Sequence, residues 1–262
     1  MQQTFKLATQ LAGGVRALML DLHKWTDSSG ISRVMLCHGS SDSFCTGAVG
    51  SNYVEPRVSL AAGLRPVKEF LEKHPNEIVT IFLESYIGDA GLVRQAFVDA
   101  GLQGYLFDPA NDPAWTDRKA WPTLEWMIAN GKRLLVTSSN AADSAAGAVG
   151  IAPHYEVAVE NTYDLGKTGS DDACTARSAS YALGSVHDRQ KLFVMNNFRS
   201  LPNLIAASED NRPDRIVARV KKKCMPEAKR PPNYVAVDFY QHPNCGAANA
   251  VIEINSLWES YR

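Results

Sequence analysis

The sequence predicts a single α/β domain of the (β/α) barrel type. Short apolar segments that suit buried strands alternate along the chain with segments that suit helices. Apolar strands separated by helices indicate a parallel sheet that is buried on both faces. A barrel is the simplest closure of such a sheet at 262 residues, and neither a linker nor an internal repeat divides the chain. We therefore expect one barrel domain over residues 1–262.

The expected helices and strands have recognisable sequence signals. The segment Ser59 to His74 begins with a serine suited to an N-cap, carries apolar residues at helical spacing and ends before Pro75. β-branched residues are frequent in Ile78 to Glu84, as in a buried strand. By the same criteria we expect helices over 4–12, 59–74, 123–129, 215–223 and 247–258, and strands over 15–22, 33–38, 78–84, 133–138, 156–160, 192–197 and 234–240.

One connection departs from this alternation. Between Leu22 and Arg33 there is no room for the crossover helix that usually joins parallel neighbours. The turn-forming run Asp27-Ser28-Ser29-Gly30 lies in this interval. We therefore predict a hairpin, whose return strand carries His38 back toward the level of Asp21.

Three predicted apolar strands carry an acidic residue near their carboxyl ends. Asp21, Glu84 and Asp238 occupy the region where barrel enzymes place their functional groups. His23 shares a face with Asp21, because side chains two residues apart in a strand point the same way. Buried carboxylates are costly unless a cation, a histidine or a phosphate-binding network pairs with them. The structural alternative is that each carboxylate caps a neighbouring loop.

His38 is a further candidate for proton transfer. It stands in the sequence Leu-Cys-His-Gly, whose glycine leaves room for a ligand or for a sharp turn. A single histidine at a strand end is more often structural than catalytic, but the expected nearness of Asp21 and His23 favours a catalytic role. We expect His38 and the strand-end acids to surround one phosphate-sized opening.

Several segments resemble the X-domain of phosphatidylinositol-specific phospholipase C, most closely the secreted single-domain phosphodiesterases of fungi and bacteria. The resemblance runs over essentially the whole chain and implies a distorted (β/α) barrel of the phospholipase C-like type. The most specific matches are Gly14 to His23 (GVRALMLDLH), Leu36 to Gly39 (LCHG) and Asn76 to Tyr86 (NEIVTIFLESY), with weaker ones at Trp121 to Ile128, Glu160-Asn161 and Tyr234 to Tyr240.

The resemblance implies phosphodiester cleavage by two histidines. One, on the first barrel strand, deprotonates the inositol 2-hydroxyl that attacks phosphorus, and the second, corresponding to His38, protonates the departing diacylglycerol oxygen. Asp21 falls where the family has a metal-ligating carboxylate or an arginine, and Glu84 matches a ligand of the calcium-dependent branch. The candidate catalytic residues are His38, Asp21, His23, Glu84 and Asp238. Asp21 and Glu84 would hold Ca²⁺ or Mg²⁺, and a metal-independent reaction is the alternative.

Two departures from the family pattern leave alternatives open. Met19 stands where calcium-dependent members carry another carboxylate. The family's first strand, with its general-base histidine, would precede Thr4, so we expect a barrel that lacks this strand; His23 is not favoured as a substitute. The protein is then either an enzyme whose first segment lies upstream or a non-catalytic module that binds a phosphorylated headgroup. A glycerophosphodiester phosphodiesterase or sphingomyelinase-type enzyme is a further alternative, although Met19-Leu20-Asp21 lacks the Glu-x-Asp pair usual there.

Composition limits the partners. The net charge of −1 disfavours nucleic acid as a partner. The N-terminus has no apolar signal-peptide region, and no segment approaches the ~20 apolar residues of a membrane span. Taken literally, these features predict a soluble intracellular protein, whereas the resemblance implies a secreted one. We expect a monomer that acts on a phospholipid or related phosphodiester, with a peripheral membrane surface as a partner.

The five cysteines favour a disulfide-bonded protein over a set of free thiols. Cys37 and Cys45 lie eight positions apart, a spacing that suits a small disulfide loop. Cys174, Cys224 and Cys245 lie in polar, loop-like sequence, and the odd count leaves one partner unassigned.

Overall fold

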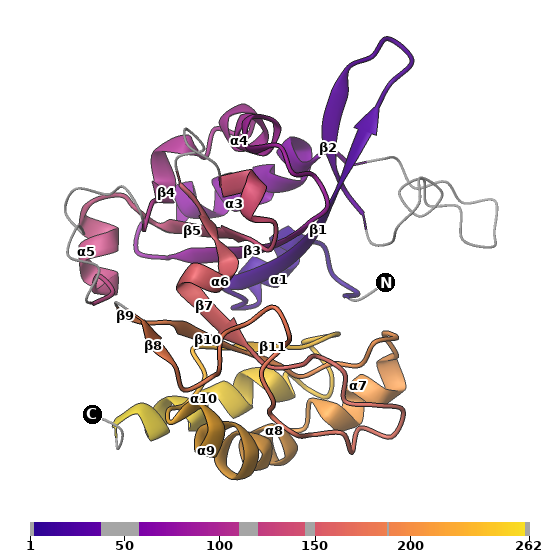
Figure 1. The fold of residues 1–262 in the computed structure, drawn as a ribbon, viewed down its shortest axis with the longest axis vertical. Helices are drawn as coiled ribbons and strands as arrows, with labels where there is room; N and C mark the ends of the chain where they lie inside the picture. Colours follow the sequence, from indigo (N-terminus) through magenta and orange to yellow (C-terminus); the bar gives the residue numbers. More distant parts are fainter. Residues whose placement is uncertain (1–2, 38–57, 110–119, 145–149, 188, 260–262) are drawn as a thin grey trace. The chain divides into compact units, whose positions relative to one another are not determined.

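The computed structural model describes residues 3–37, 58–109, 120–144, 150–187 and 189–259 (Figure 1). The chain separates into two compact units. The N-terminal unit is Leu7–His154, and the C-terminal unit combines Met1–Lys6 with Tyr155–Arg262. Each unit contains parallel strands together with helices, which confirms the predicted α/β class.

A mixed sheet organises the N-terminal unit. Its strands follow the order β2-β1-β3-β5-β4, with β6 also paired to β5, and β2 is antiparallel to β1 whereas the other pairs are parallel. The elements are α1 (Leu7–Ala12), β1 (Ala17–Thr26), β2 (Ser32–Leu36), α3 (Leu60–Lys73), β3 (Val79–Ser85), α4 (Ala90–Asp99), η1 (Gln103–Tyr105), β4 (Leu106–Phe107), α5 (Leu124–Ala129), β5 (Leu134–Ser138), η3 (Ala141–Ser144) and β6 (Ile151–Pro153).

Side-chain caps start the helices of this unit. The hydroxyl of Ser59 accepts the N–H of Ala62 at 3.3 Å at the start of α3. The hydroxyl of Thr123 likewise accepts the N–H of Trp126 at 3.1 Å at the start of α5. Each bond satisfies a backbone donor that the first turn of a helix leaves unpaired. Both residues are the N-caps that the sequence predicts.

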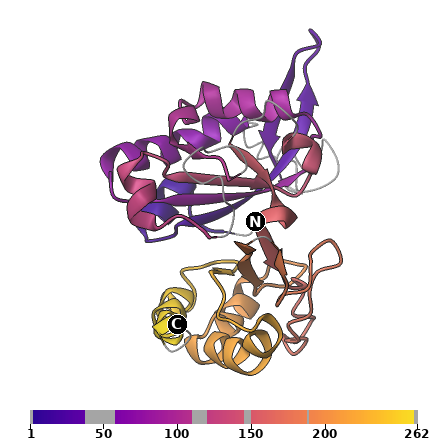
Figure 2. The same cartoon turned by 60° about the vertical axis from the view of Figure 1, so that its left-hand side comes forward.

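The two faces of the N-terminal sheet differ in polarity. Leu18, Leu20 and Leu22 alternate along β1, are buried and belong to the apolar core that also contains residues of α3 and α4. Figure 1 and Figure 2 show these two helices on the same side of the sheet. The intervening residues Met19 and Asp21 point to the opposite face, because side chains alternate along a strand. The polar face therefore lies away from the helices.

A second, parallel sheet organises the C-terminal unit in the order β11-β10-β7. Helices α8 and α10 share an apolar core with β7 and β10, and α8, α9 and α10 lie on one side of the sheet in Figure 1 and Figure 2. The elements are α6 (His154–Val157), which starts at the last residue of the N-terminal unit, β7 (Ala158–Glu160), β8 (Val186–His187), β9 (Arg189–Gln190), β10 (Leu192–Asn196), α7 (Leu204–Asp210), α8 (Pro213–Arg219), the π-helix η4 (Val220–Cys224), α9 (Met225–Ala228), β11 (Tyr234–Ala236) and α10 (Gly246–Glu259).

The last strand is shorter than the sequence predicts. β11 ends at Ala236, and Phe239 adopts a left-handed backbone with φ 46°, which cannot continue a strand. The side chain of Gln3 stabilises this turn, because it donates to the carbonyl of Val237 at 2.8 Å and accepts the N–H of Tyr240 at 3.1 Å. Asp238 therefore lies in a turn after the strand rather than within it.

The cysteines of the C-terminal unit are in two environments. Cys174 and Cys224, 50 positions apart, form a disulfide and are buried in the apolar core. Cys174 lies in a loop, as expected, whereas Cys224 ends the π-helix η4. Cys245 is a free, exposed thiol. In the N-terminal unit Cys37 is disulfide-bonded. Cys45, its predicted partner, lies outside the described residues. Across the described ranges, no helix has the length and apolar character needed to span a bilayer.

Among the described residues, no strand pairs with part of one edge of β1. The strand β2 pairs along Leu22–Thr26, whereas β3 pairs along Ala17–Leu22 on the other edge. Thr80 donates to the carbonyl of Arg16 at 2.8 Å, so alternate β1 residues direct their backbone groups toward β3. The backbone groups of Ala17 and Met19 point the other way, where no described strand pairs with them. The described strands accordingly form separate sheets and not a closed barrel.

Amide hydrogen exchange tests this open edge. The N–H of Leu20 lies in the ladder with β3, whereas the N–H of Met19 points to the open edge. We expect the Met19 amide to exchange at least about a hundredfold faster than the Leu20 amide after correction for intrinsic rates. NMR-detected exchange measures both amides in one sample, and equal protection would contradict an open edge.

Candidate functional site

The carboxyl ends of β1 and β3 bring two acidic side chains together. Asp21 and Glu84 are direct partners in the parallel register, so both lie on the polar face of the sheet. The hydroxyl of Tyr86 donates to Oε1 of Glu84 at 2.7 Å. Two neighbouring carboxylates repel each other, and a cation, an imidazole or a hydroxyl at this position lowers that repulsion.

His23 adds an imidazole to this pair. It lies two residues beyond Asp21 and therefore on the same face of β1. Its ring stacks on the ring of Tyr86 with centroids 4.6 Å apart and an interplanar angle of 16°. Asp21, His23, Glu84 and Tyr86 form the group that we call the strand-end cluster. Its side chains are half-buried, apart from Tyr86, which is exposed, so a ligand can reach them.

The hairpin brings the segment before His38 to this cluster. The antiparallel register pairs Leu22 with Leu36, and the N–H of Cys37 donates to the carbonyl of Asp21 at 3.1 Å. This confirms the predicted hairpin. His38 itself lies outside the described residues.

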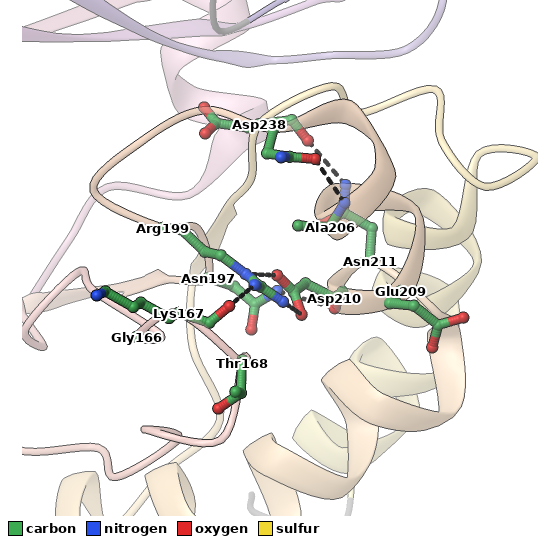
Figure 3. A network of polar contacts seen from close by, with 12 residues as sticks. Gly166, Lys167, Thr168, Asn197, Arg199, Ala206, Glu209, Asp210, Asn211 and Asp238 are labelled. Atoms are coloured by element: carbon green, nitrogen blue, oxygen red, sulfur yellow. Dashed lines mark hydrogen bonds and ion pairs between the residues drawn. The ribbon is translucent and has the colours of Figure 1, made fainter.

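Asp238 belongs to the C-terminal unit and occupies an unusual environment for an acid. It is buried, and the described residues provide no hydrogen bond to its carboxylate. Its backbone carbonyl accepts the Nδ2 donor of Asn211 at 2.7 Å, while Figure 3 shows the carboxylate directed away from that contact. Burial raises the pKa of Asp238 to about 7. A carboxyl group with this pKa exchanges a proton near neutral pH.

Sequence reasoning assigned no role to the acid that ends β7. Glu160 is buried, and its carboxylate accepts hydrogen bonds from Asn196 Nδ2 at 2.9 Å, Tyr155 Oη at 2.7 Å and Arg177 Nη1 at 3.0 Å. The pattern that made Glu84 a candidate is an acidic residue at the carboxyl end of an apolar strand. The sequence that ends at Glu160 has the same pattern. Because its oxygens are engaged, Glu160 joins β7 to β10 and is not available as a base.

The described residues do not complete a metal site by themselves. Within the described ranges, no three His, Cys, Asp or Glu side chains are grouped as metal ligands would be. Asp21 and Glu84 offer two carboxylates, and Met19 on the same face offers a thioether, which Ca²⁺ and Mg²⁺ do not favour. Binding of either ion to Asp21 and Glu84 therefore stays a prediction, and no step below depends on it.

Comparison with known proteins places the chain in a family. The family model PI-PLC X 1 matches residues 1–253. The chain belongs to the PI-PLC X domain family.

Relatives of this PI-PLC X domain protein occur in plants and fungi. A PI-PLC X domain-containing protein of Arabidopsis thaliana is 32% identical over 256 residues, which cover 94% of this chain and 53% of the relative. PI-PLC X domain-containing protein 1 of Arthroderma benhamiae is 34% identical over 147 residues, 54% of this chain and 41% of the relative. An uncharacterized secreted protein of the same fungus is 23% identical over 269 residues, 95% of this chain and 54% of the relative. The chain thus spans about half of the length of these relatives, or less.

Solved structures show the same fold. The phosphatidylinositol-specific phospholipase C of Listeria monocytogenes superposes with a TM-score of 0.54 at 16% sequence identity. The match covers 96% of this chain and 83% of the Listeria chain. A mutant of the corresponding enzyme of Staphylococcus aureus matches 97% of the chain and 83% of its own with a TM-score of 0.52 and 17% identity. At this identity the similarity shows the fold alone.

The raised pKa of Asp238 predicts a pH-dependent stability. Between an unfolded-state pKa of about 3.9 and the native value of about 7, the native protein keeps a proton that the unfolded chain has lost. The free energy of unfolding therefore falls as pH rises through this window, by at most about 1.4 kcal/mol per pH unit. Denaturant unfolding should show Asp238→Asn gaining stability relative to the wild type from about pH 4 to about pH 7.

Asp214 provides the matched control for this measurement. It is exposed, and the hydrogen bond from Arg212 lowers its pKa. Asp214→Asn should differ from the wild type by a constant amount above about pH 5, because there this carboxyl group is ionised in both states. A flat profile for Asp238→Asn would show that Asp238 titrates normally.

Proposed function

We propose that this protein cleaves phosphodiesters of phosphatidylinositol-like phospholipids. The observation that carries the proposal is the pairing of Asp21 with Glu84 at two strand ends, together with the hydrogen bond from Cys37 to Asp21. This hydrogen bond holds the chain that leads to His38 beside two carboxylates. Membership of the PI-PLC X domain family supports the substrate class.

His38 is the proposed general acid. An imidazole near two carboxylates has a raised pKa, because the negative charges favour the imidazolium form. In this form it donates a proton to the alcohol oxygen that leaves phosphorus as the P–O bond breaks. Asp21 and Glu84 would orient the ring and keep it protonated, and His23 would contribute a further polar contact from the same face.

Asp238 is proposed either to accept the proton itself or to stabilise the basic side chain that accepts it. A group with a pKa of about 7 is well matched to proton transfer at neutral pH. Its buried carboxylate would also favour the charged form of a basic side chain placed against it. The family resemblance assigns the base to a histidine, and Asp238 would then stabilise the imidazolium form of that residue.

We propose a single distorted barrel domain for the whole chain. The family model and the fold similarity to the Listeria enzyme both extend across the two units. The open edge at Ala17 and Met19 would accept the further strand that a barrel needs for closure.

A binding module without cleavage is the second candidate. It is favoured by Met19, 43% exposed on the polar face beside Asp21, where the family resemblance expects another carboxylate. A vesicle assay separates the two candidates. Release of soluble inositol phosphate from phosphatidylinositol vesicles indicates the enzyme, whereas vesicle binding without release indicates the module.

We further propose a secreted monomer that works at a membrane surface. The Cys174–Cys224 disulfide supports secretion, because such bonds persist in oxidising compartments. The segment after β10 exposes Leu201 and Ile205 to 81% and 82%, with Leu204 beside them at 43%. Apolar side chains this exposed suit insertion among lipid headgroups.

Replacement of His38 tests the catalytic proposal. In the full-length protein, His38→Ala should lower phosphatidylinositol cleavage by at least ~10²-fold, the usual effect of losing a general acid. The control is His74→Ala, which removes an exposed imidazole at the end of α3 and should leave the rate unchanged. Unchanged turnover in His38→Ala would remove His38 from the mechanism.

Replacement of the exposed aliphatic residues tests membrane contact. The double variant Leu201→Ser/Ile205→Ser should bind phosphatidylinositol vesicles at least about tenfold more weakly, because each change removes apolar surface available to the bilayer. Val251→Ser/Ile252→Ser removes exposed aliphatic side chains from α10 and serves as the control. Sedimentation with vesicles measures both. Equal losses in the two double variants would argue against a specific membrane surface.

A further inference from the structure

A small polar cavity lies within the C-terminal unit, and its lining contains none of the residues proposed for catalysis. Its volume is about 40 Å³, which exceeds the ~10–15 Å³ that one water needs. Two arginines contribute to its wall. The lining residues are Leu165, Gly169, Asp172, Asn197, Asp210, Arg215 and Arg219.

Arg219 is the most deeply buried cation of this wall. It is 5% exposed, and burial lowers the pKa of its guanidinium to about 10. Nε donates to the carbonyl of Asp172 at 3.0 Å, and Nη1 donates to Oδ1 of Asn197 at 2.9 Å and to the carbonyl of Asn196 at 2.7 Å. Nη2 is buried and has no hydrogen-bond partner among the described residues. A buried charged donor without a hydrogen-bond partner destabilises the folded state, unless a ligand accepts its hydrogen bond.

The neighbouring acids are matched by other cations. Asp210 accepts two hydrogen bonds from Arg199, at 2.6 and 3.0 Å (Figure 3). Asp172 lies 3.6 Å from Nζ of Lys223. Arg215 also pairs with Asp210 and Glu209, so among the described residues Arg219 is the cation of the cavity wall that has no ion pair.

Arg215 is held at the rim of this cavity. Its Nη2 donates to the carbonyl of Gly169 at 3.3 Å, and its Nη1 lies 3.5 Å from Oδ1 of Asp210. A Cβ atom at Gly169, where φ is 73°, would come within 2.5 Å of Asp210 and 2.7 Å of Arg199. Only glycine therefore lets the loop approach the ion pair so closely and present this carbonyl to Arg215.

We propose that this cavity binds a small inorganic anion, of the size range from chloride to phosphate, between Arg215 and Arg219. The anion would accept a hydrogen bond from Nη2 of Arg219, which has no partner among the described residues, and would balance the charge of this unpaired guanidinium. Arg219 also donates hydrogen bonds to Asn196 and Asn197 at the carboxyl end of β10. A bound anion that fixes Arg219 would therefore stabilise this end of the strand. The proposal does not depend on the proposed phosphodiesterase activity.

Thermal unfolding of the full chain at neutral pH tests the proposal. Sodium chloride and sodium phosphate are compared with sodium gluconate at equal ionic strength, because gluconate is too large for the cavity. Chloride, phosphate or both should raise Tm along a saturating curve, as expected for a ligand that binds the native state. Equal shifts in all three salts would overturn the proposal and leave water as the occupant.

Two variants locate the effect. Arg215→Gln should weaken the apparent affinity for the anion by at least about tenfold, because it removes one charged donor. Arg212→Gln is the matched control, because Arg212 pairs with Asp214 at 3.1 Å and does not line the cavity. The affinity of this variant for the anion should equal that of the wild type. Equal weakening in both variants would contradict a site at Arg215.

A bromide soak gives an answer that does not depend on any variant. Bromide resembles chloride in size and scatters anomalously. An anomalous peak between Arg215 and Arg219 in crystals of the wild-type protein supports the site. A cavity without this peak at a bromide concentration that saturates any rise in Tm would overturn it.

Discussion

The register between β1 and β3 is the constraint on which the candidate site depends. Because side chains alternate strictly along a strand, pairing Asp21 with Glu84 also places Met19 beside Phe82 on the polar face and Leu20 beside Leu83 in the core. A slip of β1 by one residue would bury Asp21 under α3 and expose Leu18, Leu20 and Leu22. The free energy of burying those leucines therefore fixes the position of the acids. The hairpin extends the same register to Cys37, through the carbonyl of Asp21.

In this protein, the number of hydrogen bonds that a buried polar group makes distinguishes structural residues from candidate functional ones. Glu160 is buried with three donors around its carboxylate, and it behaves as part of the scaffold. Asp238 is buried without such donors, and its pKa rises as a result. Arg219 donates three hydrogen bonds, and its Nη2 has no partner among the described residues. Leftover hydrogen-bonding capacity, rather than burial itself, is what marks Asp238 and Arg219 as sites where a further group would be stabilised.

Local patterns predicted most of the elements of the N-terminal unit, although α4, β4 and β6 were not among them. The interval between Leu22 and Arg33 is too short for a helix, so a hairpin followed directly, and alternation along β1 put His23 and Asp21 on one face. The N-caps Ser59 and Thr123 were also predicted, because the bond that each one makes is local.

The C-terminal unit depends more on partners that are distant in sequence. The turn after Ala236 is held by Gln3, more than two hundred residues away, so no local pattern predicts where β11 ends. The polar sequence around Cys174 and Cys224 concealed their burial, because the apolar residues that surround them come from other strands and helices. The cavity at Arg219 combines Asp172 and Asn197 with a helix end, and only the folded chain brings these together.

The Cys174–Cys224 bond links folding of the C-terminal unit to the redox state of its surroundings. The enclosed stretch contains β10, the middle strand of the three-stranded sheet, so the bond removes many of the unfolded conformations in which that strand is far from its neighbours. A loop of about this length contributes roughly 4 kcal/mol in the chain-entropy description. In a reducing compartment this contribution is absent, and the polypeptide becomes a better substrate for proteolysis. Oxidation of this one pair of thiols therefore contributes strongly to the stability of the C-terminal unit.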